Sequence, residues 1–335
     1  MSDPMKLDRR QALALGAGAA ALASQAACAQ TSVAADSDPD LTGTSILITG
    51  CSSGFGRIGA EHYARLGAKV FATMRNLPRD EADQLRDLAN TENLDLTVIE
   101  IDVTSDTQVE AGVAQALAAA DGKLDVLVNN AGIGISGPVE LQDMEATRLA
   151  FETNVFGCHR MVRAVLPAMR AAGRGLIIPI SSQLGRLIVP GIGHYSATKF
   201  ALESMSEQLA YELVPRGIDV TIVQPGGYPT KVWVNRNIYT RDLKDRSDAE
   251  RLEGYPEFAP QMGEEDGSGR SADPMDVPRA IVDLISMPRG TRPLRRAVHP
   301  SYRPQEGVNE AMADAQLQFL GNTPVGPWIT DVLTR

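Results

Sequence analysis

Short runs of apolar residues recur along the chain between residues 45 and 224, each bounded by turn-forming or charged positions. Runs of this length, apolar at consecutive positions, are typical of strands buried on both faces of a sheet. Longer stretches with helical periodicity separate them. The predicted strands are residues 45–49, 69–73, 95–101, 124–129, 175–180 and 219–224. The predicted helices are residues 57–66, 80–89, 106–120, 144–172 and 195–214, and we expect Pro167 to bend the fourth.

This alternation predicts an α/β fold, a doubly wound parallel sheet of Rossmann-like type with helices on both faces. After the sixth strand, Pro225-Gly226-Gly227 opens an irregular segment, which we interpret as a substrate lid over about residues 228–274. A helix over 274–287 and a short strand over 294–298 follow. The pattern indicates one catalytic domain, residues 45–300, with an inserted lid, and a C-terminal extension, residues 301–335, with a helix around 307–320.

The N-terminal residues differ in kind from the rest of the chain. Lys6, Arg9 and Arg10 precede an Ala/Gly/Leu run over 12–27, which ends in a small-residue pattern at Ala29. This is typical of a secretory signal over residues 1–29, and the arginine pair favours the twin-arginine type. Residues 30–44 then form a polar linker. The run is too short for a membrane span, so the interpretation is a folded periplasmic protein. An uncleaved helix on a cytoplasmic protein is the alternative.

Composition excludes several classes of partner. The chain has 335 residues and a formal net charge of −10, so it lacks the basic surface that a nucleic-acid partner requires, and nothing favours anionic lipid. The candidate metal ligands are Cys51, Cys158 and His194, and they lack the spacing of a metal site. We therefore predict no metal and no disulfide framework.

The first strand runs into a glycine-rich turn, Thr49-Gly50-Cys51-Ser52-Ser53-Gly54-Phe55-Gly56, and a helix follows. Glycines let a backbone turn sharply and approach a ligand closely, and a helix N-terminus offers free N–H groups to a phosphate. The spacing of such glycines is a weak signal by itself. Between a strand and a helix it predicts a dinucleotide-binding loop.

The second strand indicates which dinucleotide is bound. NAD-binding sheets usually carry an acidic residue at the end of this strand, where it accepts hydrogen bonds from the ribose. Here Met74 occupies that position and Arg75 follows it. An arginine suits a 2′-phosphate, so we expect NADP(H) to be preferred over NAD(H).

Tyr195 and Lys199 lie four positions apart at the start of a predicted helix, so their side chains share one face. Keeping a phenol of pKa ~10 ionised at pH 7 costs roughly 4 kcal/mol. An ammonium at ~4 Å with an effective dielectric constant near 20 contributes about 4 kcal/mol of attraction. The spacing therefore suffices to make Tyr195 usable as a base.

From about residue 44 to 300, the chain resembles the short-chain dehydrogenase/reductase family. The motifs that carry the resemblance are the glycine loop, Asp102-Val103, Asn129-Asn130-Ala131-Gly132, Asn154, Ser182 thirteen positions before Tyr195, the Y-x-x-x-K pair Tyr195 and Lys199, Pro225-Gly226, and Thr230. Phe55 departs from the usual aliphatic residue, and Pro229 is an extra proline in the loop.

The resemblance implies cofactor-binding and catalytic residues. The residues expected at the cofactor, with Arg75 added from its position, are Gly50, Ser52, Ser53, Gly54, Phe55, Gly56, Arg75, Asp102, Val103, Asn130, Ala131, Gly132, Tyr195, Lys199, Pro225, Gly226 and Thr230. The implied catalytic set is Asn154, Ser182, Tyr195 and Lys199.

The implied roles describe hydride transfer between nicotinamide and a small alcohol or carbonyl substrate. Tyr195 would act as general acid/base, and Ser182 would donate a hydrogen bond to the substrate oxygen. Lys199 would bind the ribose and connect through water to Asn154. The family also implies a homo-oligomer, for which the helices over 144–172 and 195–214 are candidate interfaces.

Two other functions share this scaffold. An epimerase or dehydratase would use a bound nicotinamide transiently, and a non-catalytic protein would only sense NADP(H). The complete set of four catalytic residues disfavours the sensor, and the ordinary Ser182–Tyr195 spacing gives no reason to prefer the epimerase. We expect the substrate pocket between residues 134–140 and the lid.

Overall fold

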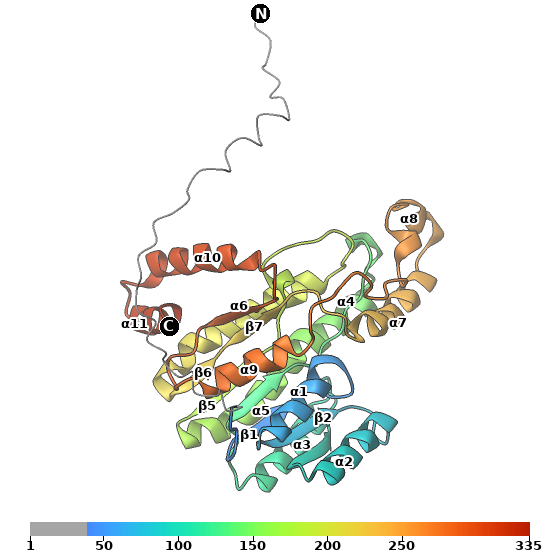
Figure 1. Ribbon diagram of the computed structural model, residues 1–335. Coiled ribbons are helices and arrows are strands. Elements are labelled where there is room, and N and C mark those ends of the chain that lie inside the picture. Colours follow the sequence, from blue (N-terminus) through green and yellow to red (C-terminus); the bar gives the residue numbers. More distant parts are fainter. Residues whose placement is uncertain (1–38) are drawn as a thin grey trace, which may run out of the picture. The chain divides into compact units, whose positions relative to one another are not determined.

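The computed structural model describes residues 39–335 (Figure 1). The predicted signal and its cleavage site lie outside these residues, as does most of the predicted linker, and they stay predictions. Leu41 is packed into the domain: its side chain is buried, and its N–H donates to the carbonyl of Leu66 at 2.8 Å.

A parallel sheet forms the centre of the described region, in the order β3-β2-β1-β4-β5-β6. Its strands are β1 (Ser45–Ile48), β2 (Lys69–Met74), β3 (Leu96–Glu100), β4 (Val126–Asn129), β5 (Gly175–Pro179) and β6 (Ile218–Val220). The chain winds outward from β1 in one direction and from β4 in the other, so the switch point lies between them. Ligands of such sheets bind at the carboxyl ends of the strands there. The predicted fold class is confirmed.

The predicted sixth strand is wrong in one respect, because it divides in two. Thr221 separates β6 from β7 (Ile222–Pro225), which pairs with β8 (Arg295–Val298) and keeps only an isolated bridge, Val223 to Ile180, on the side of β5. The cause lies in β5. Ile177 and Ser181 both bond to this neighbouring segment, through Thr221 N–H and the Val223 carbonyl, and Pro179 stands between them. Proline has no N–H to donate, so the ladder is interrupted at that point.

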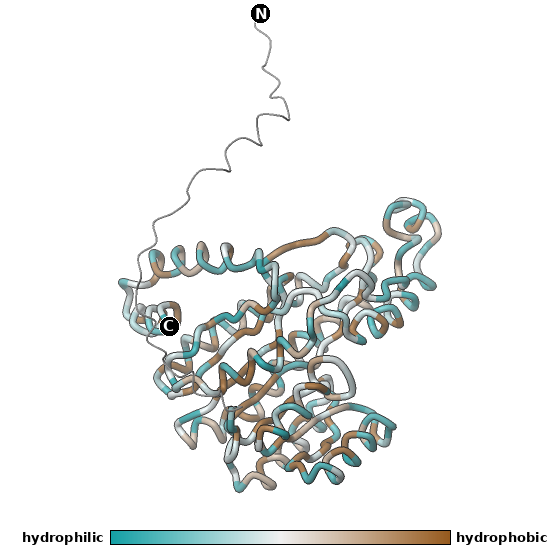
Figure 2. The backbone as a smooth tube through the Cα atoms, viewed as in Figure 1, coloured by the Kyte–Doolittle hydropathy of each residue, from teal (hydrophilic) through white to brown (hydrophobic). Residues whose placement is uncertain are grey.

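Helices cover both faces of the sheet, because the strands alternate apolar side chains between two cores. Ile46 and Ile48 face α1 (Gly54–Arg65), α2 (Asp80–Glu92) and α9 (Asp276–Ser286), whereas Leu47 faces α3 (Asp106–Ala119), α5 (Gly157–Ala172) and α6 (Tyr195–Leu213). The strands are accordingly among the most hydrophobic segments in Figure 2.

The predicted helix over 144–172 is not continuous. It consists of α4 (Met144–Phe151), a π-helical turn over Glu152–Phe156, and α5. The turn contains Asn154, and such insertions into α-helices are frequent at functional sites. Pro167 lies inside α5, so the interruption comes from the π turn and not from the proline.

The predicted lid is more regular than its sequence suggests. It contains α7 (Val232–Asp245), α8 (Ala249–Glu253) and a 3-10 turn over Ala259–Gln261 before the chain enters α9. Leu243 and Met262 of this segment pack on Ile135, Leu141 and Ala146, which forms a third, smaller apolar cluster. The cluster holds the lid against the loop that follows β4.

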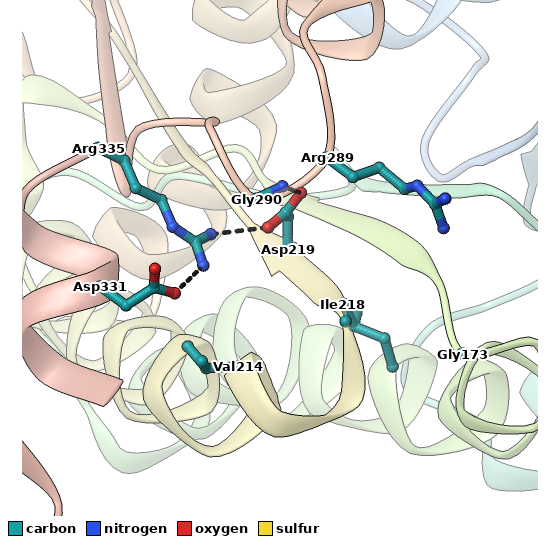
Figure 3. Close-up of a pocket in the computed structure, with 9 residues that line it drawn as sticks. Gly173, Val214, Ile218, Asp219, Arg289, Gly290, Asp331 and Arg335 are labelled. Atoms are coloured by element: carbon teal, nitrogen blue, oxygen red, sulfur yellow. Dashed lines mark hydrogen bonds and ion pairs between the residues drawn. The ribbon is translucent and has the colours of Figure 1, made fainter. Parts of the chain in front are cut away.

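The C-terminal extension is helical and is anchored by buried charges. It comprises α10 (Gln305–Leu320), near the predicted position, and α11 (Gly326–Leu333). Arg335 donates to the carboxylate of Asp219 in β6 at 2.7 Å, and Arg292 donates to its other oxygen at the same distance. Figure 3 shows Asp219 and Arg335 beside a cavity of about 520 Å³. Gly173 and Gly217, which precede β5 and β6, also line it, so it lies at the amino ends of the strands, opposite the switch point.

No helix between residues 39 and 335 combines the length and hydropathy needed to cross a bilayer.

We predict that Asp219→Asn lowers the free energy of unfolding by about 3–5 kcal/mol, because it leaves the buried guanidinium of Arg292 without a counter-charge and leaves Arg335 with Asp331 alone. Denaturant unfolding followed by circular dichroism measures the loss. Asp83→Asn is the matched control, since its ion pair with Arg86 is exposed and contributes about 0–1 kcal/mol. Equal, small losses for both variants would contradict the expectation.

Candidate active site

The glycine loop and the loop after β4 are bound to each other at the switch point. The hydroxyl of Thr49 accepts from the N–H groups of Asn130 (3.0 Å) and Ala131 (2.9 Å), and Asn130 Nδ2 donates to the Thr49 carbonyl at 2.8 Å. The contact is so close that a Cβ on Gly50 would lie 2.9 Å from the Ala131 Cα. The structure thus brings the two predicted motifs together at the carboxyl ends of β1 and β4.

The start of α1 suits an anion. Ser53 is its N-cap residue and makes no side-chain capping bond within the described chain, and the first turn carries no acidic side chain. A Cβ on Gly56 would lie 2.3 Å from the Gly50 carbonyl oxygen, so only glycine lets the loop fold back this tightly. These features fit a dinucleotide pyrophosphate at the helix N-terminus.

Asn154 connects the loop after β4 to the helix that carries the catalytic candidates. It is 1% exposed; its side chain accepts from the N–H of Ile133 (2.8 Å) and donates to the Ile133 carbonyl (2.9 Å). Its Nδ2 also donates to the hydroxyl of Thr198 in α6 at 3.0 Å. Asn154 therefore fixes where α6 stands relative to the loop.

Tyr195 and Lys199 begin α6 and share one face. The ammonium of Lys199 lies 5.7 Å from the centre of the Tyr195 ring and donates to the carbonyl of Ile180 at 2.8 Å. A Cβ on Gly132 would lie 3.8 Å from this nitrogen and 3.2 Å from Asn154 Oδ1. Lys199 of the predicted pair and the predicted relay asparagine thus meet at Gly132.

Ser182 follows β5 and is buried. Its hydroxyl accepts from the N–H of Leu184 at 3.1 Å, which caps the 3-10 turn over Gln183–Gly185. An acceptor role of this kind leaves the hydroxyl proton free to donate elsewhere. The side chain is therefore held in place by the backbone without losing its donor.

Asp102 and Val103, two of the residues expected at the cofactor, lie after β3. The carboxylate of Asp102 accepts from the N–H of Thr104 (2.9 Å) and from its hydroxyl (2.8 Å), so it shapes its own turn. Val103 is buried, and a Cβ on Gly157 would lie 2.7 Å from its side chain.

Pro225 ends β7, and the N–H of Gly226 donates to the carbonyl of Val298 in β8 at 3.0 Å. Thr230 lies close to the glycine loop, because a Cβ on Gly54 would be 3.8 Å from its side chain. The unusual Phe55 has a partner in the same segment, since its ring meets that of Tyr228 edge-on at 5.4 Å. The departure at Phe55 is thus matched by an aromatic residue of the lid.

Arg75, at the end of β2, contacts the lid. Its guanidinium donates to the hydroxyl of Tyr239 in α7 at 2.7 Å. Met74, which occupies the position where NAD-binding sheets usually carry an acidic residue, is buried. Asn235 Nδ2 of α7 also reaches the hydroxyl of Ser53 in the glycine loop, at 3.5 Å. The helix α7 therefore spans from the glycine loop toward Tyr195.

Several lid residues near the site escaped the sequence prediction. Thr240 of α7 accepts from the N–H of Ser136 at 3.0 Å, and Phe258 packs on Gly191 in the loop before Tyr195. Arg236 lies against Gly134, beside Tyr195. Nothing in the spacing of the lid sequence marks these positions, because their partners are about 70 to 100 residues away.

The buried thiols are not reactive groups. Burial raises the pKa of Cys51 to about 12 and that of Cys158 to about 11, so both stay protonated at neutral pH. Among residues 39–335, no three or more histidine, cysteine, aspartate or glutamate side chains gather where a metal ion could be held.

Comparison with known proteins identifies the family. The family model described as short chain dehydrogenase matches residues 44–239. The chain belongs to the short-chain dehydrogenase family. The resemblance is thus confirmed, and of the predicted activity the oxidoreductase class is confirmed.

Two curated relatives illustrate the range of short-chain dehydrogenases that the chain resembles. A 3-ketodihydrosphingosine reductase of Bacteroides thetaiotaomicron is 44% identical over 193 residues, which are 58% of this chain and 67% of that protein. Retinol dehydrogenase 8 of Homo sapiens is 36% identical over 266 residues, which are 77% of this chain and 82% of that protein.

Solved short-chain dehydrogenase structures are similar over most of the domain. One from Streptomyces avermitilis is 33% identical with a TM-score of 0.66 and covers 82% of this chain and 96% of its own. A Brucella melitensis 3-ketoacyl-(acyl-carrier-protein) reductase complexed with NADH is 28% identical (TM-score 0.60; 74% and 92% covered). A serine dehydrogenase complexed with NADP⁺ is 26% identical (TM-score 0.64; 77% and 97% covered). These neighbours support a nicotinamide cofactor and leave both forms open.

We predict that Gly56→Ala weakens dinucleotide binding at least about tenfold and lowers the melting temperature, because the added methyl meets backbone at Gly50. Fluorescence titration with NADPH and thermal unfolding measure the two effects. Gly307→Ala in α10 is the control: its Cβ meets nothing within 4 Å, and the same change should stabilise by up to about 1 kcal/mol. Unchanged NADPH affinity in the Gly56 variant would place the cofactor elsewhere.

Proposed function

We propose that this short-chain dehydrogenase is an NADP(H)-dependent alcohol dehydrogenase/carbonyl reductase in which Tyr195 is the general acid/base. One observation supports the proposal most strongly: Lys199 and Asn154 lie together at Gly132. Tyr195 lies beside them, and the glycine loop is hydrogen-bonded to the same loop after β4. A dinucleotide along the β1 and β4 ends would place its reactive ring among these groups. When bound, the nicotinamide supplies or accepts the hydride.

Gly50 to Gly56 and the start of α1 would hold the pyrophosphate, and Asn130, Ala131 and Gly132 would line the path toward the ribose. Asp102 and Val103 would border the adenine. Pro225, Gly226 and Thr230 would close the opposite wall, since Thr230 already lies near Gly54. The backbone geometry at each of these positions is compatible with a ligand approaching closely.

The protein's own chemistry is the movement of a proton at the substrate oxygen. In reduction, the Tyr195 hydroxyl gives its proton to the carbonyl oxygen, and in oxidation it takes the alcohol proton. The Ser182 hydroxyl donates a hydrogen bond to the same oxygen and stabilises charge that develops there. The Lys199 ammonium favours the phenolate that remains after Tyr195 has given up its proton.

Asn154 has a positioning role in this scheme. Both donors of its amide and one acceptor position are engaged with Ile133 and Thr198, so the loop and α6 keep one spacing through the proton transfer. We include a water-mediated link from Lys199 past Asn154 to solvent, because both polar groups face Gly132. Such a chain would return the proton of Tyr195 after each turnover.

Preference for NADP(H) is proposed from Arg75. Its guanidinium lies at the end of β2, where a Rossmann-type fold binds the adenosine ribose of its cofactor. The neighbouring Met74 supplies no carboxylate that would repel a 2′-phosphate. The present partner of Arg75 is a neutral hydroxyl of the lid. A 2′-phosphate would offer a charged acceptor in its place.

Tyr195→Phe should reduce kcat at least about a hundredfold, because the hydroxyl that carries the proton is removed. NADPH oxidation with a panel of aldehydes and ketones, followed by absorbance, measures the rate, and NADPH affinity should change less than about threefold. Tyr302→Phe is the matched control, since that side chain is exposed and far along the sequence in the C-terminal extension. Turnover by the Tyr195 variant at the wild-type rate would refute the mechanism.

Arg75→Ala should raise KM for NADPH by about 10- to 100-fold, the value of a charge-assisted hydrogen bond, and leave KM for NADH nearly unchanged. Steady-state kinetics with both cofactors measure the effect. Arg86→Ala removes an exposed arginine from α2 as a control. A loss of the same size with NADPH and NADH would show that Arg75 supports the lid and does not select the cofactor.

A further inference from the structure

A largely buried arginine of the lid stands beside Tyr195. Arg236 lies on α7, and its side chain is 12% exposed. A Cβ on Gly134 would be 3.0 Å from Arg236 Cδ and 3.8 Å from Cδ2 of the Tyr195 ring, so both side chains border the same point of the loop after β4. That loop is the wall on which we expect the substrate.

The charges around Arg236 do not balance. Two guanidiniums, those of Arg236 and Arg270, stack on the ring of Trp233, with distances of 4.8 and 3.7 Å to its centre. They share one carboxylate, that of Glu265. Arg270 hydrogen-bonds it at 3.1 Å, and the N–H of Gly267 donates to the same oxygen at 2.9 Å. Arg236 is left at 3.8 Å, beyond hydrogen-bond distance.

The donors of Arg236 are correspondingly unused. Its Nε is buried and has no hydrogen-bond partner among residues 39–335. Burial lowers the pKa of this guanidinium, and the charge of Arg270 acts in the same direction. Burying a charged donor without an acceptor is costly, so an unpartnered buried nitrogen beside a candidate active site calls for an explanation, and a ligand is one that fits.

We propose that Arg236 receives a carboxylate of the substrate, so that the enzyme acts on oxo acids or hydroxy acids. The Nε edge of a guanidinium presents two parallel N–H groups, the geometry that a carboxylate fills with both oxygens. Because the methylene stem of Arg236 and the ring of Tyr195 border one point of the loop, we expect the carboxylate and the reacting carbonyl to be separated by few bonds. This inference rests on the proposed function and names its substrate class.

The lid has an apolar part that would accept the remainder of such a molecule. Met262 packs on Gly137 and Phe258 on Gly191, on the two loops that lead to the site. An acid with an alkyl tail meets both features, the arginine at one end and the apolar side chains at the other.

The experiment compares 2-, 3- and 4-oxooctanoate with their methyl esters, using full-length enzyme and NADPH. Each ester keeps the carbonyl and the tail but removes the charge. For at least one pair, kcat/KM of the wild type should favour the acid by about tenfold or more. In Arg236→Met this acid-to-ester ratio should fall toward one, and in Arg236→Lys it should be intermediate.

Arg241→Met is the matched control, because Arg241 lies on the same helix, is exposed and pairs with Glu264. Its acid-to-ester ratio should equal that of the wild type. The wild-type ratio needs no variant, so a poorly folded Arg236→Met leaves the comparison decisive.

Three outcomes overturn the inference: esters reduced as fast as acids by the wild type, reduction of none of the six compounds, or an acid-to-ester ratio unchanged in Arg236→Met. Esters or other neutral ketones reduced without acid preference, in a way that Tyr195→Phe abolishes, would leave the proposed function standing and remove only the carboxylate site. Reduction of the acids that survives in Tyr195→Phe would instead remove the proposed function.

Discussion

The site depends on the buried amide of Asn154. Through two hydrogen bonds it holds the backbone of Ile133, and through a third it holds Thr198 on α6. The loop after β4 is tied in turn to the glycine loop by Thr49. A single side chain therefore sets the distance between the dinucleotide cradle and the helix that presents Tyr195 and Lys199. The π turn is the structural means, since it inserts a residue and directs Asn154 inward from a helix that is otherwise regular.

The amino ends and the carboxyl ends of the strands differ in how their charged side chains are paired. At the amino ends, Asp219 is matched by two arginines, one of which also pairs with Asp331, so the charges there are compensated. At the carboxyl ends, Lys199 and Arg236 stand near Tyr195 with less acidic compensation. Buried ion pairs contribute little net stability, but removing one partner is costly. The same physics thus fixes the fold where the partners are complete and favours a bound anion where they are not.

Local patterns could be predicted from the sequence. They gave the strands, the doubly wound order and the motifs around Gly50, Asn130 and Tyr195, through apolar runs, glycine turns and a four-residue helical spacing. The division of the strand at Thr221 could not be, because its cause is Pro179, some forty residues earlier. The position of Arg236 was likewise out of reach, since it follows from the fold of a lid whose apolar residues are few. The π turn at Asn154 gives no periodic signal at all. The features that could not be predicted from the sequence are interactions between segments that lie far apart in the chain.

The anchoring of Asp219 also bears on how the polypeptide assembles as it leaves the ribosome. Its two guanidinium partners come 73 and 116 residues later, and β7 must wait for β8 before its free edge is paired. Pairings at such separations close slowly, because the intervening chain has to be ordered first. Strands β1 to β5, which carry the glycine loop, are by contrast made before β6 and β7, although Tyr195, Lys199 and Pro225 still have to follow. Synthesis therefore produces the glycine loop and its five strands before the outer edge of the sheet exists, and a prematurely terminated product retains an unpaired edge strand, which is a surface prone to aggregation.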